Sequence, residues 1–144
     1  MSIPDFHGKT AALLGAGVSN MPLAGYLVSH GAAVTARDKK TEDALGENAA
    51  KLRALGVRLI CGEEYLDGMR EDYIFRSPGF RPDLPALREA AAHGSCVTSE
   101  MELFLANRPC PVVGITGCDG KTTTTTLISE ILKRALAPRG AEVF

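Results

Sequence analysis

The sequence predicts an α/β fold in which short parallel strands alternate with helices. Apolar runs of strand length recur along the chain, and segments with apolar residues spaced four apart lie between them. Glycines mark the points where one pattern gives way to the other. This alternation is typical of a parallel sheet with right-handed crossover connections.

The first elements are a strand, a helix and a second strand. Thr10 to Leu14 is a short apolar run that ends at a glycine, as expected for a strand covered on both faces. Next comes an amphipathic helix, which Gly31 closes as its C-cap. Residues 33–36 then predict a second strand, which delivers Asp38 to its carboxyl end.

The same reasoning extends the sheet. The patterns predict, in order, a helix over 41–55, strands over 58–61 and 73–76, and helices over 84–93 and 99–106. Residues 107–111 contain two prolines and cannot continue a helix, so a new sheet is expected after them. It would begin with a strand over 112–116, followed by a glycine turn, an amphipathic helix and another strand starting at 142–144.

The most specific motif is the glycine turn over 114–122, which ends in Gly120-Lys121-Thr122. Backbone N–H groups of such a turn and the positive end of the following helix face one spot, where Lys121 adds a charge. The spacing departs from G-x-x-x-x-G-K-[ST], because Ile115 stands where that pattern has its first glycine. The context still favours nucleotide phosphate binding, with Lys121 at the β- and γ-phosphates and the Thr122 hydroxyl on Mg²⁺.

A second glycine turn follows the first strand and reads Gly15-Ala16-Gly17-Val18-Ser19-Asn20. It resembles the dinucleotide fingerprint G-x-G-x-x-G of Rossmann-like domains, with Asn20 in place of the third glycine. Asp38 lies about twenty residues beyond, as the acidic residue of that fingerprint does. The alternative is a tight strand-to-helix turn that Ser19 or Asn20 caps.

Two further candidates lie at strand ends. Asp38 can accept hydrogen bonds from ribose hydroxyls or a base imide, although its neighbours Arg37, Lys39 and Lys40 fit a solvated surface run equally well. Ser77-Pro78-Gly79 follows the strand over 73–76, where proline keeps Ser77 extended and Gly79 permits a close backbone approach. The carboxyl edge of a parallel sheet is where ligands bind, but this bend alone would be an ordinary turn.

Composition excludes several classes of protein. Sixteen basic and seventeen acidic residues give a formal charge of -1, which argues against a nucleic-acid-coating protein. The four cysteines contain no C-x-x-C pair, so we expect reduced thiols and neither a zinc site nor a disulfide framework. No segment has the length of a signal peptide core or a membrane span. We therefore expect a soluble cytoplasmic protein with no nucleic-acid or membrane partner. We also expect it to be a monomer.

Taken together, the motifs resemble the N-terminal part of the Mur ligases of bacterial peptidoglycan synthesis. The resemblance spans nearly the whole chain and rests on residues 15–20, 37–40, 77–79, 99–104 and 114–122. It implies ATP-dependent, ADP-forming amide bond formation, in which the carboxylate of UDP-MurNAc-L-alanine is phosphorylated and D-glutamate then attacks. The shortened Thr-Gly-x-x-Gly-Lys-Thr loop of this family accounts for the unusual spacing noted above.

The family's functional residues carry over to matching positions. ATP would contact Gly117, Cys118, Asp119, Gly120, Lys121, Thr122 and Thr123, with Lys121 and Thr122 catalytic and Thr122 also a Mg²⁺ ligand. Cys118 stands where the family usually has Thr or Ser, which leaves its backbone N–H as the expected contact. The UDP group would be held by Gly17, Val18, Ser19, Asp38, Lys39, Ser77, Pro78 and Gly79.

The resemblance also implies a division of the chain. Residues 1–99 would form the UDP-substrate-binding domain, 100–111 a linker with a helix, and 112–144 a truncated beginning of the P-loop, ATP-binding central domain. We expect this chain alone to be inactive in ligation, because further magnesium ligands and the D-glutamate domain have no residues here. Two alternatives are an NAD-binding module and a non-catalytic nucleotide-binding regulatory domain.

Overall fold

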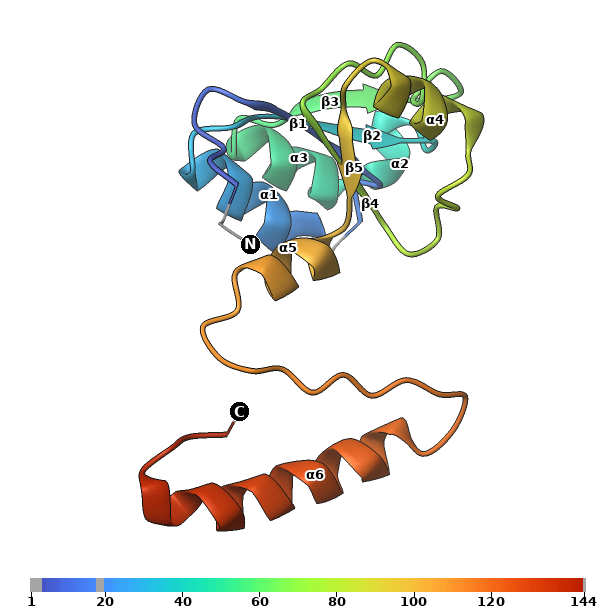
Figure 1. Ribbon diagram of the computed structural model, residues 1–144. Helices are drawn as coiled ribbons and strands as arrows, with labels where there is room; N and C mark the ends of the chain where they lie inside the picture. The colour runs from blue at the N-terminus through green and yellow to red at the C-terminus, as the bar shows by residue number, and fades with distance from the viewer. Residues whose placement is uncertain (1–3, 18–19, 144) are drawn as a thin grey trace. The chain divides into compact units, whose positions relative to one another are not determined.

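The computed structural model of the chain describes residues 4–17 and 20–143 (Figure 1). It divides into two compact units, Met1–Arg108 and Pro109–Phe144. The predicted site residues Val18 and Ser19 lie outside the described residues. Among the helices of the described part, none is both long and apolar enough to cross a membrane.

The first unit is built on a five-stranded sheet with the order β3-β2-β1-β4-β5, and all its strand pairs are parallel. The strands are β1 (Thr10–Leu14), β2 (Ala33–Asp38), β3 (Arg58–Cys61), β4 (Tyr73–Arg76) and β5 (Cys96–Thr98). The α/β class and the Rossmann-like parallel sheet are thus confirmed. Leu14 at the end of β1 pairs with Arg37 of β2 and Arg76 of β4, so three strands end side by side.

The α-helices in the described part of this unit are α1 (Met21–Ser29), α2 (Glu42–Leu45), α3 (Glu47–Ala54), α4 (Pro85–Ala92) and α5 (Glu100–Ala106). The single helix predicted over 41–55 is wrong, because Gly46 interrupts it at φ +53° and ψ −123°. Glycine adopts this non-helical geometry readily. The N-cap of α5 is Ser99, whose side chain accepts a hydrogen bond from the Glu102 N–H.

Two hydrophobic clusters cover the two faces of the sheet. Leu13 belongs to the cluster that includes residues of α1, α3 and α5, whereas Leu14 belongs to the cluster that includes residues of α4. Successive strand residues point to opposite faces, and both leucines are completely buried. The prediction that β1 is covered on both sides is therefore confirmed, and the glycine corner leaves the sheet from a rigid central strand.

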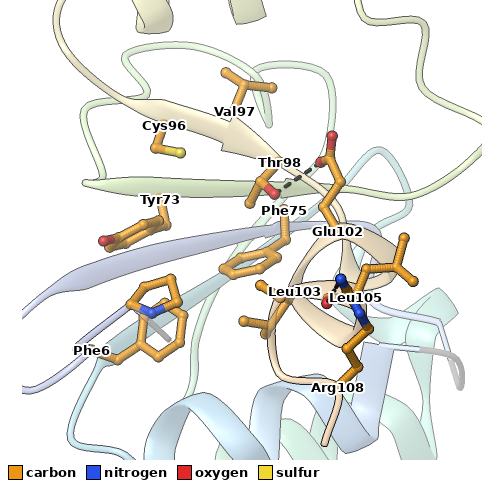
Figure 2. A pocket seen from close by; sticks show the side chains of 12 residues that line it. Phe6, Tyr73, Phe75, Cys96, Val97, Thr98, Glu102, Leu103, Leu105 and Arg108 are labelled. Carbon is orange, nitrogen blue, oxygen red and sulfur yellow. Dashed lines mark hydrogen bonds between the residues drawn. The ribbon is translucent and has the colours of Figure 1, made fainter. Parts of the chain in front are cut away.

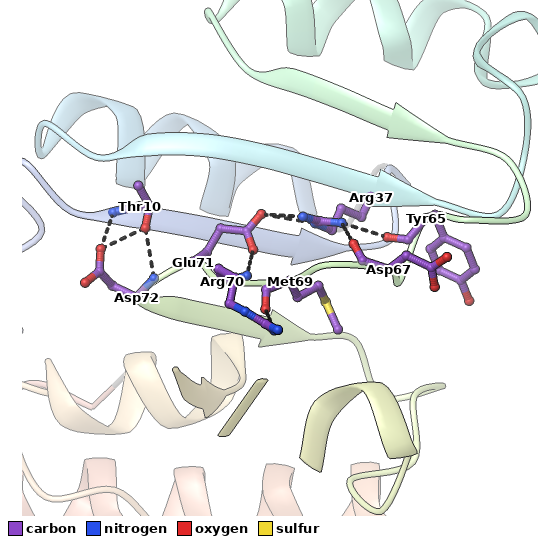
Figure 3. A network of polar contacts seen from close by, with 8 residues as sticks. All are labelled: Thr10, Arg37, Tyr65, Asp67, Met69, Arg70, Glu71 and Asp72. Atoms are coloured by element: carbon purple, nitrogen blue, oxygen red, sulfur yellow. Dashed lines mark hydrogen bonds and ion pairs between the residues drawn. The ribbon is translucent and has the colours of Figure 1, made fainter. Parts of the chain in front are cut away.

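A buried ion pair ties the loop between β3 and β4 to the sheet (Figure 3). Arg37 is only 5% exposed, and its guanidinium lies 2.9 Å from the carboxylate of Glu71. It also donates to the carbonyls of Tyr65 and Asp67. The solvated-run alternative is thus wrong for Arg37, although Lys39 is exposed as that alternative expected.

The second unit consists of α6 (Lys121–Leu136), the short 3₁₀ helix η2 (Ala137–Arg139) and irregular segments. The strand predicted over 112–116 is wrong, because these residues form no regular structure. Residues 142 and 143 are not in a strand either, and Phe144 lies outside the described residues. A strand needs a neighbour for its backbone groups, and the described part of this unit contains none. The described part of the second unit therefore contains the predicted helix but not the predicted sheet.

Candidate functional site

The glycine corner and Asp38 meet at the carboxyl edge of the sheet. The Asp38 carboxylate accepts a hydrogen bond from the Ala16 N–H through Oδ2, at 2.8 Å. Its other oxygen accepts from the Lys40 N–H at 2.9 Å, which leaves the carboxylate half-buried between the two loops. The Gly15 N–H donates to the Arg37 carbonyl at 2.8 Å. The acidic residue predicted from its spacing thus lies against the glycine turn.

The Ser-Pro-Gly bend lies on the other side of the same corner. The Ser77 hydroxyl donates to the Leu14 carbonyl at 2.5 Å, across the ends of β4 and β1. The Phe80 N–H donates to the Ser77 carbonyl at 2.9 Å and closes the bend. Pro78 and Gly79 are exposed beyond it. The structure therefore brings the three predicted elements of the UDP site to one edge.

Gly15 and Gly17 of the corner differ in whether a side chain could replace the glycine hydrogen. Gly15 has φ +102°, and a Cβ there would lie 3.3 Å from the Ser77 hydroxyl. A side chain at this position would be strained and crowded. Gly17 is exposed, and a Cβ there would meet no described heavy atom within 4 Å. None of the described residues therefore fills the space beside Gly17.

The sequence did not predict the hydrogen bonds that the Asn20 side chain makes in the structure. Asn20 is the N-cap residue of α1, but its side chain makes no capping hydrogen bond, so the alternative of a side-chain cap does not hold for Asn20. The amide turns instead toward the corner, where Nδ2 lies 2.6 Å from the Gly15 carbonyl oxygen and 3.2 Å from Ser77 Oγ. Its place in the fingerprint was visible in the sequence, but no pattern indicated that the side chain would reach Ser77.

The phosphate turn opens α6. Gly120 takes the left-handed conformation at φ +73° as the N-cap residue. The ammonium of Lys121 donates to the carbonyls of Gly117 at 2.6 Å and Cys118 at 3.1 Å. Cys118, Asp119, Thr122 and Thr123 are exposed, as are the two glycines. The first N–H groups of a helix lack intrahelical partners, so backbone donors, an ammonium and a hydroxyl gather here, a donor set that fits a polyphosphate with Mg²⁺.

The rest of the threonine run has a structural role. The hydroxyls of Thr125 and Thr126 donate to the carbonyls of Lys121 and Thr122, four residues back in α6. Such bonds satisfy threonine within a helix and leave no hydroxyl hydrogen for a ligand. These two hydroxyls therefore serve the helix itself.

A separate hollow lies elsewhere in the first unit (Figure 2). Its volume is about 620 Å³, and Phe6, Tyr73, Phe75, Thr98, Glu102 and Arg108 are among the residues that line it. The Thr98 hydroxyl donates to the Glu102 carboxylate at 2.9 Å within it. The lining that the structure describes includes none of the predicted site residues. The residues that line the hollow are scattered along the sequence, and no sequence motif predicted it.

The parallel sheet, the glycine corner and the acidic residue beside it define a domain of the Rossmann-like class, a fold that often binds nucleotides. Comparison with known proteins narrows this class. The chain is 50% identical over 130 residues to the UDP-N-acetylmuramoylalanine–D-glutamate ligase of Clostridium novyi (strain NT), over 89% of this chain and 28% of that protein. It is 52% identical over 129 residues to the ligase of the same name from Ruminiclostridium cellulolyticum, with the same two shares.

Solved structures agree. The UDP-N-acetylmuramate-alanine ligase MurC of Thermotoga maritima matches with a TM-score of 0.56 and 25% identity, over 87% of this chain and 29% of that one. The murein peptide ligase Mpl of Psychrobacter arcticus 273-4 shares the fold with a TM-score of 0.56 and 24% identity, over 89% of this chain and 27% of that one. No family model matches the chain.

Over most of its length the chain is thus similar to Mur ligases, and the curated relatives that it matches carry the name MurD. It spans about 28% of the length of these relatives.

Proposed function

We propose that the first unit binds the UDP group of UDP-MurNAc-L-alanine at the carboxyl edge of its sheet. The observation that carries this proposal is the meeting of the glycine corner, Asp38 and the Ser77 bend at the adjacent ends of β2, β1 and β4. In open α/β sheets, ligands bind beyond the carboxyl ends of the strands. Three separate segments converging there support a ligand site more strongly than any one turn.

Each predicted residue then has a role. Gly17 gives the ligand a close approach to the backbone, and the adjoining Val18 and Ser19 would continue that contact. Asp38 and the exposed Lys39 would lie beside the uracil and ribose, since Asp38 is already oriented by the Ala16 N–H. Pro78 and Gly79 are exposed, and their backbone would lie near the pyrophosphate. A cation and backbone N–H groups are the partners that suit a diphosphate.

The phosphate turn would bind ATP with Mg²⁺ in the complete enzyme. Lys121 would leave the loop carbonyls to contact the phosphates, and the Thr122 hydroxyl would hold the metal, which supplies neutralising charge for phosphoryl transfer to a carboxylate. Gly117, Cys118, Asp119, Gly120 and Thr123 would contribute mainly backbone N–H groups. We extend this proposal to the reaction of the complete enzyme, which would ligate D-glutamate and form ADP.

Ligation would need more than this chain. In P-loop proteins a sheet orients such a turn, whereas the described part of the second unit has the turn at a helix start and no strand. Catalysis depends on holding carboxylate, phosphate and amine in register, which an unsupported turn does not do. We therefore expect the 144-residue chain to bind UDP and to form no amide bond from ATP and both substrates.

Calorimetric titration of the chain with UDP-MurNAc-L-alanine, UDP, NAD and ATP tests the proposal. The expected result is preferential binding of the two uridine compounds and weakened UDP binding in Asp38→Ala. Ser29→Ala, at the far end of α1, serves as a matched surface control. Tight NAD binding, or UDP binding that Asp38→Ala leaves unchanged, would contradict the proposal and favour a dinucleotide-binding module.

A further inference from the structure

We propose that Asn20 is a positioning residue of the UDP site, whose amide fastens the glycine corner to the Ser77 bend. This inference rests on the proposed function for its ligand, but its geometry stands on the first unit alone. Asn20 is 8% exposed, so its polar side chain is more than nine-tenths buried at the edge where the ligand is expected. A buried amide is costly unless it is hydrogen-bonded.

The amide nitrogen faces three acceptors. Nδ2 lies 2.6 Å from the Gly15 carbonyl oxygen, 3.2 Å from Ser77 Oγ and 3.3 Å from the Leu14 carbonyl oxygen. Carbonyl oxygens only accept, so the nitrogen and not the oxygen of the amide must point at them. With two hydrogens for three acceptors, the whole donor capacity of Asn20 is used inside the corner.

Ser77 completes the same arrangement. Its hydroxyl has one hydrogen, which it donates to the Leu14 carbonyl at 2.5 Å, while its oxygen accepts from Asn20. That hydrogen is therefore not free for a phosphate oxygen. We infer that the Ser77 side chain holds the bend in place and that the exposed backbone of the bend faces the ligand.

The Asn20–Ser77 clamp joins three elements: the end of β1, the start of α1 and the end of β4. In the dinucleotide fingerprint, a third glycine at this position serves close packing of helix and strand. Here the side-chain amide of Asn20 connects the helix to the strand ends by hydrogen bonds instead. Fixing the corner before the ligand arrives lowers the ordering cost of binding. The expected signature is a loss of affinity that exceeds any loss of stability.

The test uses the 144-residue chain with Asn20→Ala, Ser77→Ala, the double variant and Asn20→Asp, which keeps the shape without the donors. Asn107→Ala is the control, because that amide donates to the Tyr26 hydroxyl at 3.1 Å, away from this edge. Calorimetry with UDP should show about tenfold weaker binding for each single variant and for Asn20→Asp. The double variant should lose no more than either single variant, because the two side chains act as one unit.

Two results would overturn the proposal. One is UDP affinity of Asn20→Ala within twofold of the parent, and the other is losses in the two single variants that multiply in the double variant. Ser77→Thr, which keeps the hydroxyl, should restore most of the affinity lost in Ser77→Ala.

If the parent chain does not bind UDP, the proposed function fails, and the clamp is judged separately by amide hydrogen exchange without ligand. The Gly15 amide, which donates to the Arg37 carbonyl, should exchange about tenfold faster in Asn20→Ala and unchanged in Asn107→Ala. Equal exchange in all three proteins would contradict the positioning role.

Discussion

Both units contain a glycine turn with a recognisable sequence. Among the described residues, the turn of the first unit stands on a sheet and that of the second unit does not. The corner at Gly15 follows a completely buried strand end and is bonded to the ends of two neighbouring strands. The turn at Gly120 follows an irregular segment and opens a helix whose Leu127 and Ile131 are more than half exposed. A helix bonds within itself, whereas a strand depends on segments far away in the sequence. A motif can therefore keep its local shape without its domain, but its site is built only by the sheet.

The largest effect is expected at the buried ion pair of the first unit. Arg37→Ala would leave the Glu71 carboxylate, 11% exposed, without its partner. We expect a loss of about 3–5 kcal/mol in the free energy of unfolding, measured by urea denaturation. Arg53→Ala, which breaks the exposed pair with Glu42, should cost about 0–1 kcal/mol. Equal losses in both variants would show that burial of the Arg37 pair is not decisive.

Truncating one leucine in each unit compares how much side-chain burial contributes to the stability of the two units. Leu27 of α1 is fully buried, whereas Leu127 of α6 is 59% exposed. Leu27→Ala should destabilise the first unit by about 2–5 kcal/mol. Leu127→Ala should change stability by less than about 0.5 kcal/mol. Chemical denaturation measures the free energy of unfolding of both variants. A large loss of this free energy in Leu127→Ala would mean that the Leu127 face of α6 is covered in solution.

The two glycines of the corner separate folding from binding. Gly15→Ala should cost about 1–3 kcal/mol, because of its positive φ and the nearby Ser77 hydroxyl. Gly17→Ala should leave the melting temperature nearly unchanged and weaken UDP binding, since its surroundings are open. Thermal melts measure the stability of each variant, and UDP titrations measure its affinity for UDP. A Gly17→Ala protein that binds UDP normally would remove this glycine from the proposed site.

The smallest effect concerns pH. The backbone N–H and hydroxyl of Thr10 hold the pKa of Asp72 below its ordinary value, with a further contribution from Lys9 (Figure 3). A lowered carboxylate pKa means that the ionised form stabilises the fold. This stabilisation is complete above the unfolded-state pKa, about 3.9, and is lost as the pH falls through the folded-state value.

Asp72→Asn should therefore melt slightly below the parent at neutral pH, and the difference should shrink below about pH 4. Melting curves across this range, with Asp83→Asn at the surface pair with Arg81 as the control, measure the effect. A difference that stays constant down to about pH 2 would contradict the assignment to Asp72.

Much of the first unit could be predicted from local patterns. The apolar runs gave β1, β3 and β4 with their observed bounds, and spacing alone placed Asp38 by the glycine corner. β5 was missed, because three residues are too short for a period to show. The break at Gly46 was missed because the apolar spacing continues across it.

Contacts distant in sequence were the hardest to predict. Arg37 looked like part of a charged surface run, since its partner Glu71 is 34 residues away. The Asn20 amide likewise reaches Ser77 across 57 residues. The strand expected over 112–116 failed for the converse reason: the pattern was right for a strand, but the described part of the second unit supplies no neighbour to pair with it.

The central claim is that the carboxyl edge of the first sheet binds a uridine diphosphate group. Mapping the backbone amide chemical shifts of the chain during UDP addition tests it most directly. The account predicts saturable shifts at Gly15, Gly17, Asp38 and Gly79, with residues around the hollow at Phe6 and Glu102 unaffected. Shifts centred on that hollow, or none at the corner at saturating UDP, would contradict it.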